Sequence, residues 1–107
     1  MSRAETDFST RIPASLAAHP ERARAVDAVF LFRIEGEGGG VWTLSCRGEP
    51  RVQPGEQPPI DCTLECSVED WHEISENVEV AMELFFTGRL VVTDDVALAA
   101  RLPELLA

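Results

Sequence analysis

Residues 78–102 decide the fold, and they read VEVAMELFFTGRLVVTDDVALAARL. Apolar residues first recur at helical spacing, which predicts a helix with one apolar face formed by Val78, Ala81, Met82 and Phe85. Gly88 follows where helices often end on a left-handed residue. Leu90 and Val92 alternate with the residues on either side of them, which predicts a short strand over 89–93. Asp94 and Asp95 then suit the positively polarised first turn of a last helix. That helix is expected over 94–102, before Pro103, with an apolar side of Leu98, Leu102 and Leu106.

Three longer strands and one short edge strand are predicted upstream. Residues 28–35 predict a strand that is apolar on both faces for four residues, as in a central strand, and the glycine-rich residues 36–40 predict a hairpin turn. The return strand, 41–46, and the strand 60–66 alternate, so we expect Trp42, Cys62 and Leu64 to face the helices while Asp61, Thr63 and Glu65 face away. The proline-rich connection between them leaves room for a short edge strand over 51–53.

The remaining helices are predicted from their caps and their spacing. Residues 12–18 and 20–26 form two short helices, because Pro20 suits a first helical position and Pro13 limits extension upstream. Ser67 caps a helix whose apolar side is Trp71, Ile74 and Val78, and Asn77 marks its break. Residues 1–7 are expected to be a flexible tail before a single domain over 8–107.

Charge and hydropathy exclude several partners. The chain has 107 residues, enough for one domain, and a formal net charge of −10. Such a surface repels nucleic acid and anionic headgroups, so we expect no nucleic-acid partner and no polybasic membrane anchor. No apolar run approaches the roughly 20 residues of a membrane span, and the first residues do not form a secretory signal. A cytoplasmic protein is expected.

The cysteines and histidines do not predict a catalytic or metal site. Cys62 and Cys66 lie about 13 Å apart on an extended strand, too far to form a disulfide with each other or to share one zinc ion. With Cys46 they fit reduced, buried thiols. Neither His19 nor His72 has a partner at a catalytic spacing. We therefore expect no cofactor, no metal and no enzymatic activity.

The same stretches resemble a known family. The spacing of Phe85, Gly88, Arg89 and Leu90 before a helix that carries Leu98, Ala99 and Leu102 resembles the C-terminal signature of the sterol carrier protein type 2 family. The family usually has lysine at Arg89 and glycine at Asp94. The order of strands, the Asp-Cys-Thr-Leu strand and the Glu-Asp-Trp helix start also match, so the resemblance covers roughly residues 12–106.

The resemblance and the patterns together predict one α/β domain of the α+β type. We expect a mixed, mainly antiparallel sheet of about five strands with helices packed on one face. The apolar residues alone fit a plain core. The resemblance instead implies a cavity between sheet and helices that holds a fatty acid, acyl-CoA or sterol-like lipid, non-covalently and perhaps for transfer. The expected wall is Phe30, Phe32, Trp42, Leu64, Trp71, Ile74, Val78, Met82, Phe85, Leu90, Leu98 and Leu102.

Two other functions stay open at this point. The domain could be an accessory or homodimerisation module, which a filled interior and a stable dimer would favour. It could also be a small enzyme that uses the pocket, which a buried and strongly shifted carboxylate or histidine would favour.

Overall fold

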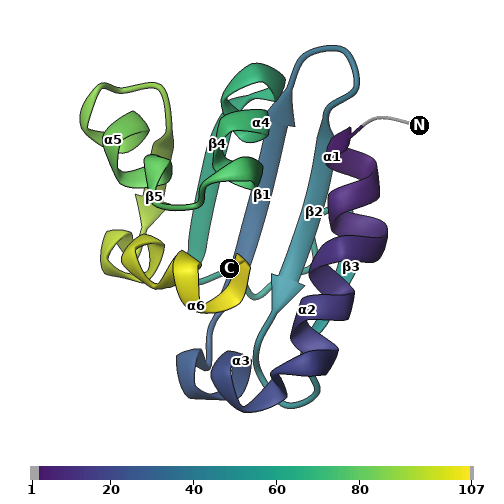
Figure 1. Ribbon diagram of the computed structural model, residues 1–107. Helices are drawn as coiled ribbons and strands as arrows, with labels where there is room; N and C mark the ends of the chain where they lie inside the picture. Colours follow the sequence, from purple (N-terminus) through teal and green to yellow (C-terminus); the bar gives the residue numbers. More distant parts are fainter. Residues whose placement is uncertain (1–2, 107) are drawn as a thin grey trace.

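A five-stranded mixed sheet forms the centre of the molecule (Figure 1). The computed structural model describes residues 3–106. The strand order is β3-β2-β1-β4-β5, and only the β1–β4 pair is parallel. The strands are β1 (Val29–Glu35), β2 (Gly40–Ser45), β3 (Arg51–Pro54), β4 (Cys62–Ser67) and β5 (Val91–Asp94). The predicted fold class is confirmed.

The helical segments lie on one face of this sheet, in front of it in Figure 1. Three of them, over residues 12–18, 20–26 and 68–76, match the predicted ranges closely, and Pro20 and Ser67 fix where the second and third begin. They are, in chain order, α1 (Arg3–Thr6), η1 (Asp7–Arg11), α2 (Ile12–Ala18), α3 (Pro20–Val26), α4 (Val68–Glu76), α5 (Val80–Phe86), η2 (Val96–Arg101) and α6 (Leu102–Leu106). Here η1 is a π-helical segment and η2 a 3₁₀ helix.

The strand register agrees with the predicted faces. Phe32 of β1 pairs with Trp42 on one side and with Leu64 on the other, so all three side chains share one face. That face joins the core under the helices, and Trp42, Cys62 and Leu64 all belong to it. Thr63 and Glu65 lie on the opposite face of β4, as expected, and Asp61 immediately precedes the strand.

The second face of the sheet is also partly covered. The connection from β3 to β4 must cross β2 and β1 because of the strand order. It is held where Thr43 Oγ1 donates to Gly55 O at 2.8 Å and accepts from Gln57 N at 2.9 Å. Leu31, Thr43 and Thr63 on this face are consequently buried.

Residues 3–7, expected to belong to a flexible tail, form α1 and the start of η1 in the structure, and Ala4 and Asp7 are buried. Residues 1 and 2 lie outside the described range. The apolar spacing of Phe8 and Ile12 extends back to Ala4, and all three side chains are buried. Pro13 does not end the helical run, because the π-helical turn η1 precedes it and Ile12 N bonds to Asp7 O.

The C-terminal segment also differs from the expectation. Residues 96–101 form a 3₁₀ helix and the helix α6 then runs through Pro103, which occupies an early helical position where its missing N–H matters little. Asp94 does not cap a helix. It ends β5 in the left-handed region, with φ of 71°, a conformation that glycine adopts most readily.

The start and the end of α4 agree with the sequence, whereas the buried face of α5 differs in part. The predicted cap is confirmed, because Asp70 N donates to Ser67 Oγ at 3.1 Å. The break at Asn77 is confirmed too, although its backbone is extended rather than left-handed. The α5 face is partly wrong, since Ala81 and Leu84 are its buried residues.

No helix among residues 3–106 is long and apolar enough to cross a membrane.

Candidate functional site

Most of the predicted wall lies deep between sheet and helices. These residues come from β1, β2, β4, α4, the α5–β5 turn and the start of α6, and each is 8% exposed or less. They belong to one continuous apolar cluster. They are Phe30, Phe32, Trp42, Leu64, Trp71, Ile74, Leu90 and Leu102. The fold therefore brings together residues that are up to 72 positions apart in the printed sequence.

The remaining predicted wall residues are half-buried. Val78, Phe85 and Leu98 pack against the cluster from its outer side. Met82 is half-buried as well, but it is not among the residues that pack against the cluster. The next aromatic, Phe86, is 80% exposed even though its ring lies 5.6 Å from that of Phe85. At the end of α5, the side chain is therefore half-buried at Phe85 and exposed at the next residue, Phe86.

Phe8 is the main residue of this layer that the sequence analysis left out. Its ring stacks on Trp42, with centroids 4.6 Å apart and planes 5° apart, and on Trp71 at 4.8 Å. It also lies 5.1 Å from Phe32. Aromatic contacts at these distances are favourable beyond the area they bury. The signal was the helical spacing of Phe8, Ile12 and Leu16, which continues across Pro13.

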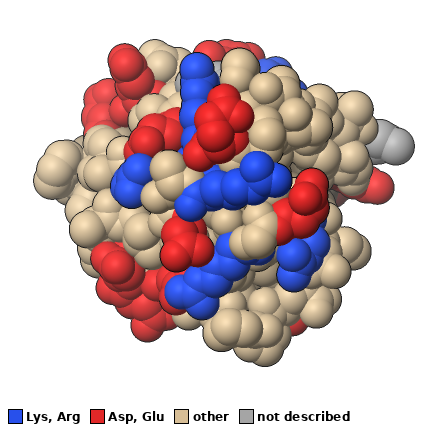
Figure 2. All heavy atoms as spheres, turned by 90° about the horizontal axis from the view of Figure 1, so that it is seen from below, with Lys and Arg blue, Asp and Glu red and all other residues tan. Residues whose placement is uncertain are grey.

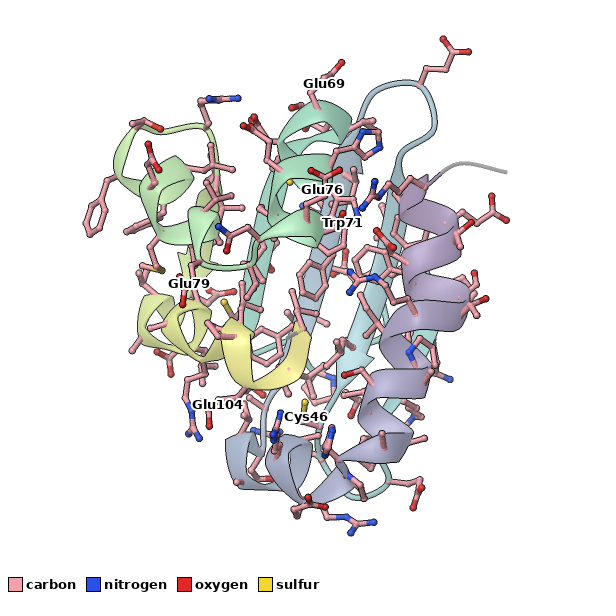
Figure 3. The ribbon with its side chains drawn as sticks, viewed as in Figure 1. Cys46, Glu69, Trp71, Glu76, Glu79 and Glu104 are labelled. Carbon is pink, nitrogen blue, oxygen red and sulfur yellow. The ribbon has the colours of Figure 1, made fainter. Side chains whose placement is uncertain are left out.

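A buried carboxylate fixes this aromatic cluster. Trp71 projects from α4 into the middle of the molecule (Figure 3), where its Nε1 donates to Asp7 Oδ2 at 3.0 Å. Asp7 is 4% exposed and also accepts from Arg11 Nε at 2.9 Å. Arg11 Nη2 is buried and has no hydrogen-bond partner among residues 3–106. The π-helical segment is thereby tied to α4 by one polar contact inside an apolar layer.

A second ion pair holds the start of α4. Arg89 Nη2 donates to the buried Asp70 and, at 3.1 Å, to Glu73 Oε2. The hydrogen bond to Asp70 and its charge raise the pKa of Arg89 above its ordinary value. Because Arg89 follows Gly88 in the α5–β5 turn, the pair fixes that turn against α4. Arg89, the cationic residue of the family signature around Gly88, therefore has a structural role.

All three cysteines are buried and free in the structure, and the burial agrees with the expected buried thiols. Burial raises the pKa of the Cys46, Cys62 and Cys66 thiols to about 12 each. Nearby carboxylates raise these pKa values further, Asp27 beside Cys46 and Asp70 beside Cys66. Figure 3 shows Cys46 at the lower end of the sheet. Thiols this hard to ionise are poor nucleophiles and poor metal ligands.

The other candidate chemical groups lie apart from the apolar layer. His19 is exposed between α2 and α3, and His72 is half-buried on α4. Asp94 and Asp95 are exposed. No group of three or more His, Cys, Asp or Glu side chains within residues 3–106 is arranged to hold a metal ion.

A groove opens beside the layer at the β3 edge of the sheet. It has a volume of about 380 Å³ and lies between α2, α3 and the start of β3. Its apolar lining includes Leu16 and Val52, which also belong to or pack against the core. Arg24 and Glu49 pair across its rim at 3.7 Å.

Comparison with known proteins assigns the family. Residues 9–107 match the SCP-2 sterol transfer family. This chain belongs to the SCP-2 sterol transfer family. The resemblance predicted from the signature around Gly88 and from the strand order is therefore confirmed.

Solved members of the family share this fold. The crystal structure of Sterol Carrier Protein 2 Like 2 from Aedes aegypti is 26% identical, has a TM-score of 0.76 and covers 95% of each chain. The solution structure of palmitated SCP2L2 from the same organism is 27% identical, with a TM-score of 0.78, and covers 99% of this chain and 95% of that one.

Curated relatives are much longer. Hydroxysteroid dehydrogenase-like protein 2 of Rattus norvegicus is 30% identical over 88 residues, which are 80% of this chain and 17% of the relative. The protein of the same name from Danio rerio is 26% identical over 90 residues, 82% of this chain and 22% of the relative. The chain therefore spans about a fifth of the length of these relatives.

Proposed function

We propose that this SCP-2 domain binds the apolar part of a fatty acid, an acyl-CoA or a sterol-like lipid between its sheet and helices. The observation that carries the proposal is the continuous apolar layer from β1 to α4, against which half-buried side chains pack. These include the predicted wall residues Val78, Phe85 and Leu98, together with Val52, Val68, Val80 and Val92. Side chains that are only half-buried have room to move when a ligand enters. The palmitated relative from Aedes aegypti makes palmitate the natural first probe.

The size of the effect can be estimated from the area that a lipid would bury. Removing roughly 400 Å² of apolar surface from water at about 25 cal/mol/Å² gives roughly 10 kcal/mol. Association and ordering cost at least about 4 kcal/mol of this, which leaves an affinity that is roughly micromolar or weaker. Selectivity for chain length is expected to be low, because one methylene contributes only about 1–3 kcal/mol.

A direct binding measurement tests this proposal. Native mass spectrometry of the purified protein would detect a co-purified lipid by its mass, and titration with palmitate, a sterol and an acyl-CoA would follow for delipidated protein. Saturable binding of any of the three at tens of micromolar supports the proposal. Absence of binding by all three overturns it.

A second function is favoured by the aromatic cluster. Phe8 already lies against Trp42, Trp71 and Phe32, so the interior next to η1 is filled by the chain's own side chain. A domain with a filled interior fits an accessory or homodimerisation module, and the curated relatives carry their matching segment within much longer chains. Sedimentation equilibrium distinguishes the two, because this second function requires a stable dimer that forms without lipid.

A further inference from the structure

The face of the sheet away from the helices carries a second, polar pocket. Its volume is about 210 Å³, and it lies between the crossing segment and strands β2 and β3. The hydrogen bonds of Thr43 with Gly55 and Gln57 hold one wall in place. At the other end of the crossing, Asp61 Oδ2 accepts from Val29 N at 2.9 Å. The pocket is thus bounded by regular strands and by a segment fixed at both ends.

Side-chain hydrogen-bond donors line one part of this pocket, and apolar Val29, Pro58 and Pro59 line the rest. Ser45 pairs with Arg51 across β2 and β3, and Thr43 pairs with Gln53, so these four side chains share one face. None of the residues that line the pocket is aspartate or glutamate, although the chain has 19 acidic residues. The lining of this pocket therefore lacks carboxylates, and the Glu49 side chain lies on the other side of Arg51, where both residues line the groove beside α2 and α3.

Arg51 differs from most other arginines of the chain, which has nine arginines and no lysine. Seven of them pair with a carboxylate, namely Arg3, Arg11, Arg24, Arg33, Arg47, Arg89 and Arg101. Figure 2 shows this interleaving of arginine and carboxylate side chains on one face of the molecule. Within residues 3–106, Arg22 and Arg51 have no such partner, and of these two only Arg51 lines a pocket.

The donors of this pocket are largely unused. Arg51 Nη1 donates to Glu49 O at 3.3 Å, and the rest of its guanidinium has no hydrogen-bond partner in the described chain. Ser45 is 7% exposed, and its hydroxyl forms no hydrogen bond with residues 3–106. The Gln53 amide is likewise unpaired over the same range. A guanidinium, a hydroxyl and an amide on one wall match the acceptor oxygens of an oxyanion, and guanidinium groups bind such oxygens in pairs.

We propose that this pocket binds an oxyanion, the phosphate group of a small dissolved ester or of a lipid headgroup. Arg51 supplies the charge, while Ser45 and Gln53 donate hydrogen bonds to the remaining oxygens. The site is separated from the apolar layer by the sheet itself, because Leu44 and Val52 alternate with these residues and face the helices. Binding here is therefore independent of lipid binding under the helices.

Titration of the folded protein with inorganic phosphate, followed by amide NMR shifts at constant ionic strength, tests this proposal. We expect saturable shifts at residues 43–45, 51–53 and 57. Arg51→Gln should weaken binding at least about tenfold, because it removes the charge and the paired donors. Ser45→Ala should weaken it by about threefold. Arg22→Gln is the matched control, since Arg22 is also unpaired but lies outside the pocket, and it should leave the affinity unchanged.

The source of the phosphate is distinguished by two further probes, glycerol phosphate and vesicles that contain phosphatidate. Saturation by free phosphate or glycerol phosphate identifies a dissolved anion. Saturation only with the vesicles identifies a headgroup, and both results support the oxyanion site. Shifts that never saturate with any probe, or that respond equally to Arg51→Gln and Arg22→Gln, would overturn it.

Discussion

Trp71 Nε1 donates a hydrogen bond to Asp7 Oδ2 at 3.0 Å, across 64 positions of the chain. The contact joins α4 to the π-helical segment η1 and places Phe8 against both tryptophans. It is a polar bond inside an apolar layer, where an unpaired partner is more costly than at the surface. The order of the N-terminal segment therefore depends on it.

Replacing Asp7 tests that dependence. Asp7→Ala leaves the Trp71 N–H and the buried part of Arg11 without their acceptor, so the free energy of unfolding should fall by about 1–3 kcal/mol. Urea denaturation measures this change. In a double-mutant cycle with Trp71→Phe, the two losses should be less than additive, because each variant removes the same bond. Strict additivity would show that the bond contributes nothing.

The apolar layer can be tested at two adjacent positions. Phe85→Asp places a carboxylate against the core and should abolish binding of a fluorescent fatty acid, because burying that charge costs several kcal/mol or more. Phe86→Asp is the matched control, since Phe86 is 80% exposed and its replacement should leave binding unchanged. Met82→Asp should have an intermediate effect, because Met82 does not pack against the cluster.

Folding must be verified for these variants by circular dichroism. If Phe85→Asp stays folded and binds the fatty acid as the parent does, Phe85 is not part of the binding wall. Equal losses in the Phe85 and Phe86 variants would also contradict the assignment.

The left-handed residue at the end of β5 makes a prediction about stability. Asp94 has φ of 71° and Asp95 has φ of −81°. Asp94→Gly removes the steric penalty of a left-handed side chain and should raise the free energy of unfolding by about 0.5–1 kcal/mol. Asp95→Gly adds only freedom to the unfolded chain and should lower it by about the same amount. Thermal melts of the two variants should therefore shift in opposite directions, and a shared direction would refute the conformational argument.

The raised pKa values of the buried thiols predict that the protein loses stability at alkaline pH. Each cysteine pKa is raised from 9.0 to about 12 by burial, so the unfolded chain loses these protons first. Stability is complete below pH 9 and falls as pH rises toward 12, by about 1.4 kcal/mol per pH unit for each thiol. The chain has no tyrosine and no lysine, so few other side chains titrate in this window.

Urea midpoints at pH 8, 9.5 and 10.5 measure that slope. Cys46→Ala should lower the stability at pH 8 and reduce the alkaline slope by about a third, because one of three buried thiols is removed. A slope that stays unchanged in this variant would show that Cys46 ionises as easily in the folded chain as in the unfolded one.

The elements with a strong local signal could be predicted from the sequence. Residues 29–32 of the central strand are apolar and buried on both faces, because helices cover one face and the segment between β3 and β4 crosses the other (Figure 1). The alternation around Trp42 and Leu64 indicates which face meets the helices. Ser67 and Pro20 define helix starts through their own chemistry. These signals are local, so they need no knowledge of what lies opposite.

The parts that could not be predicted depend on contacts distant in the chain. Residues 3–7 look polar, yet Asp7 is buried because Trp71 provides its partner. Pro13 indicates a break, but the π-helical turn before it removes the conflict. Thr63 alternates as an outward residue, yet it is buried on the face of the sheet that the segment between β3 and β4 crosses. For Asp7 the deciding group is 64 positions away in the chain, whereas for Pro13 it is the neighbouring turn η1.

Quenching of a single tryptophan by a brominated fatty acid tests the central claim most directly. The chain has two tryptophans, so Trp42→Phe leaves Trp71 alone in the middle of the layer, and bromine quenches only on contact. If a lipid binds between sheet and helices, brominated stearate should quench Trp71 saturably at tens of micromolar, while unbrominated stearate competes and restores the signal. Stearate that binds without quenching Trp71, or that does not bind, would contradict the claim.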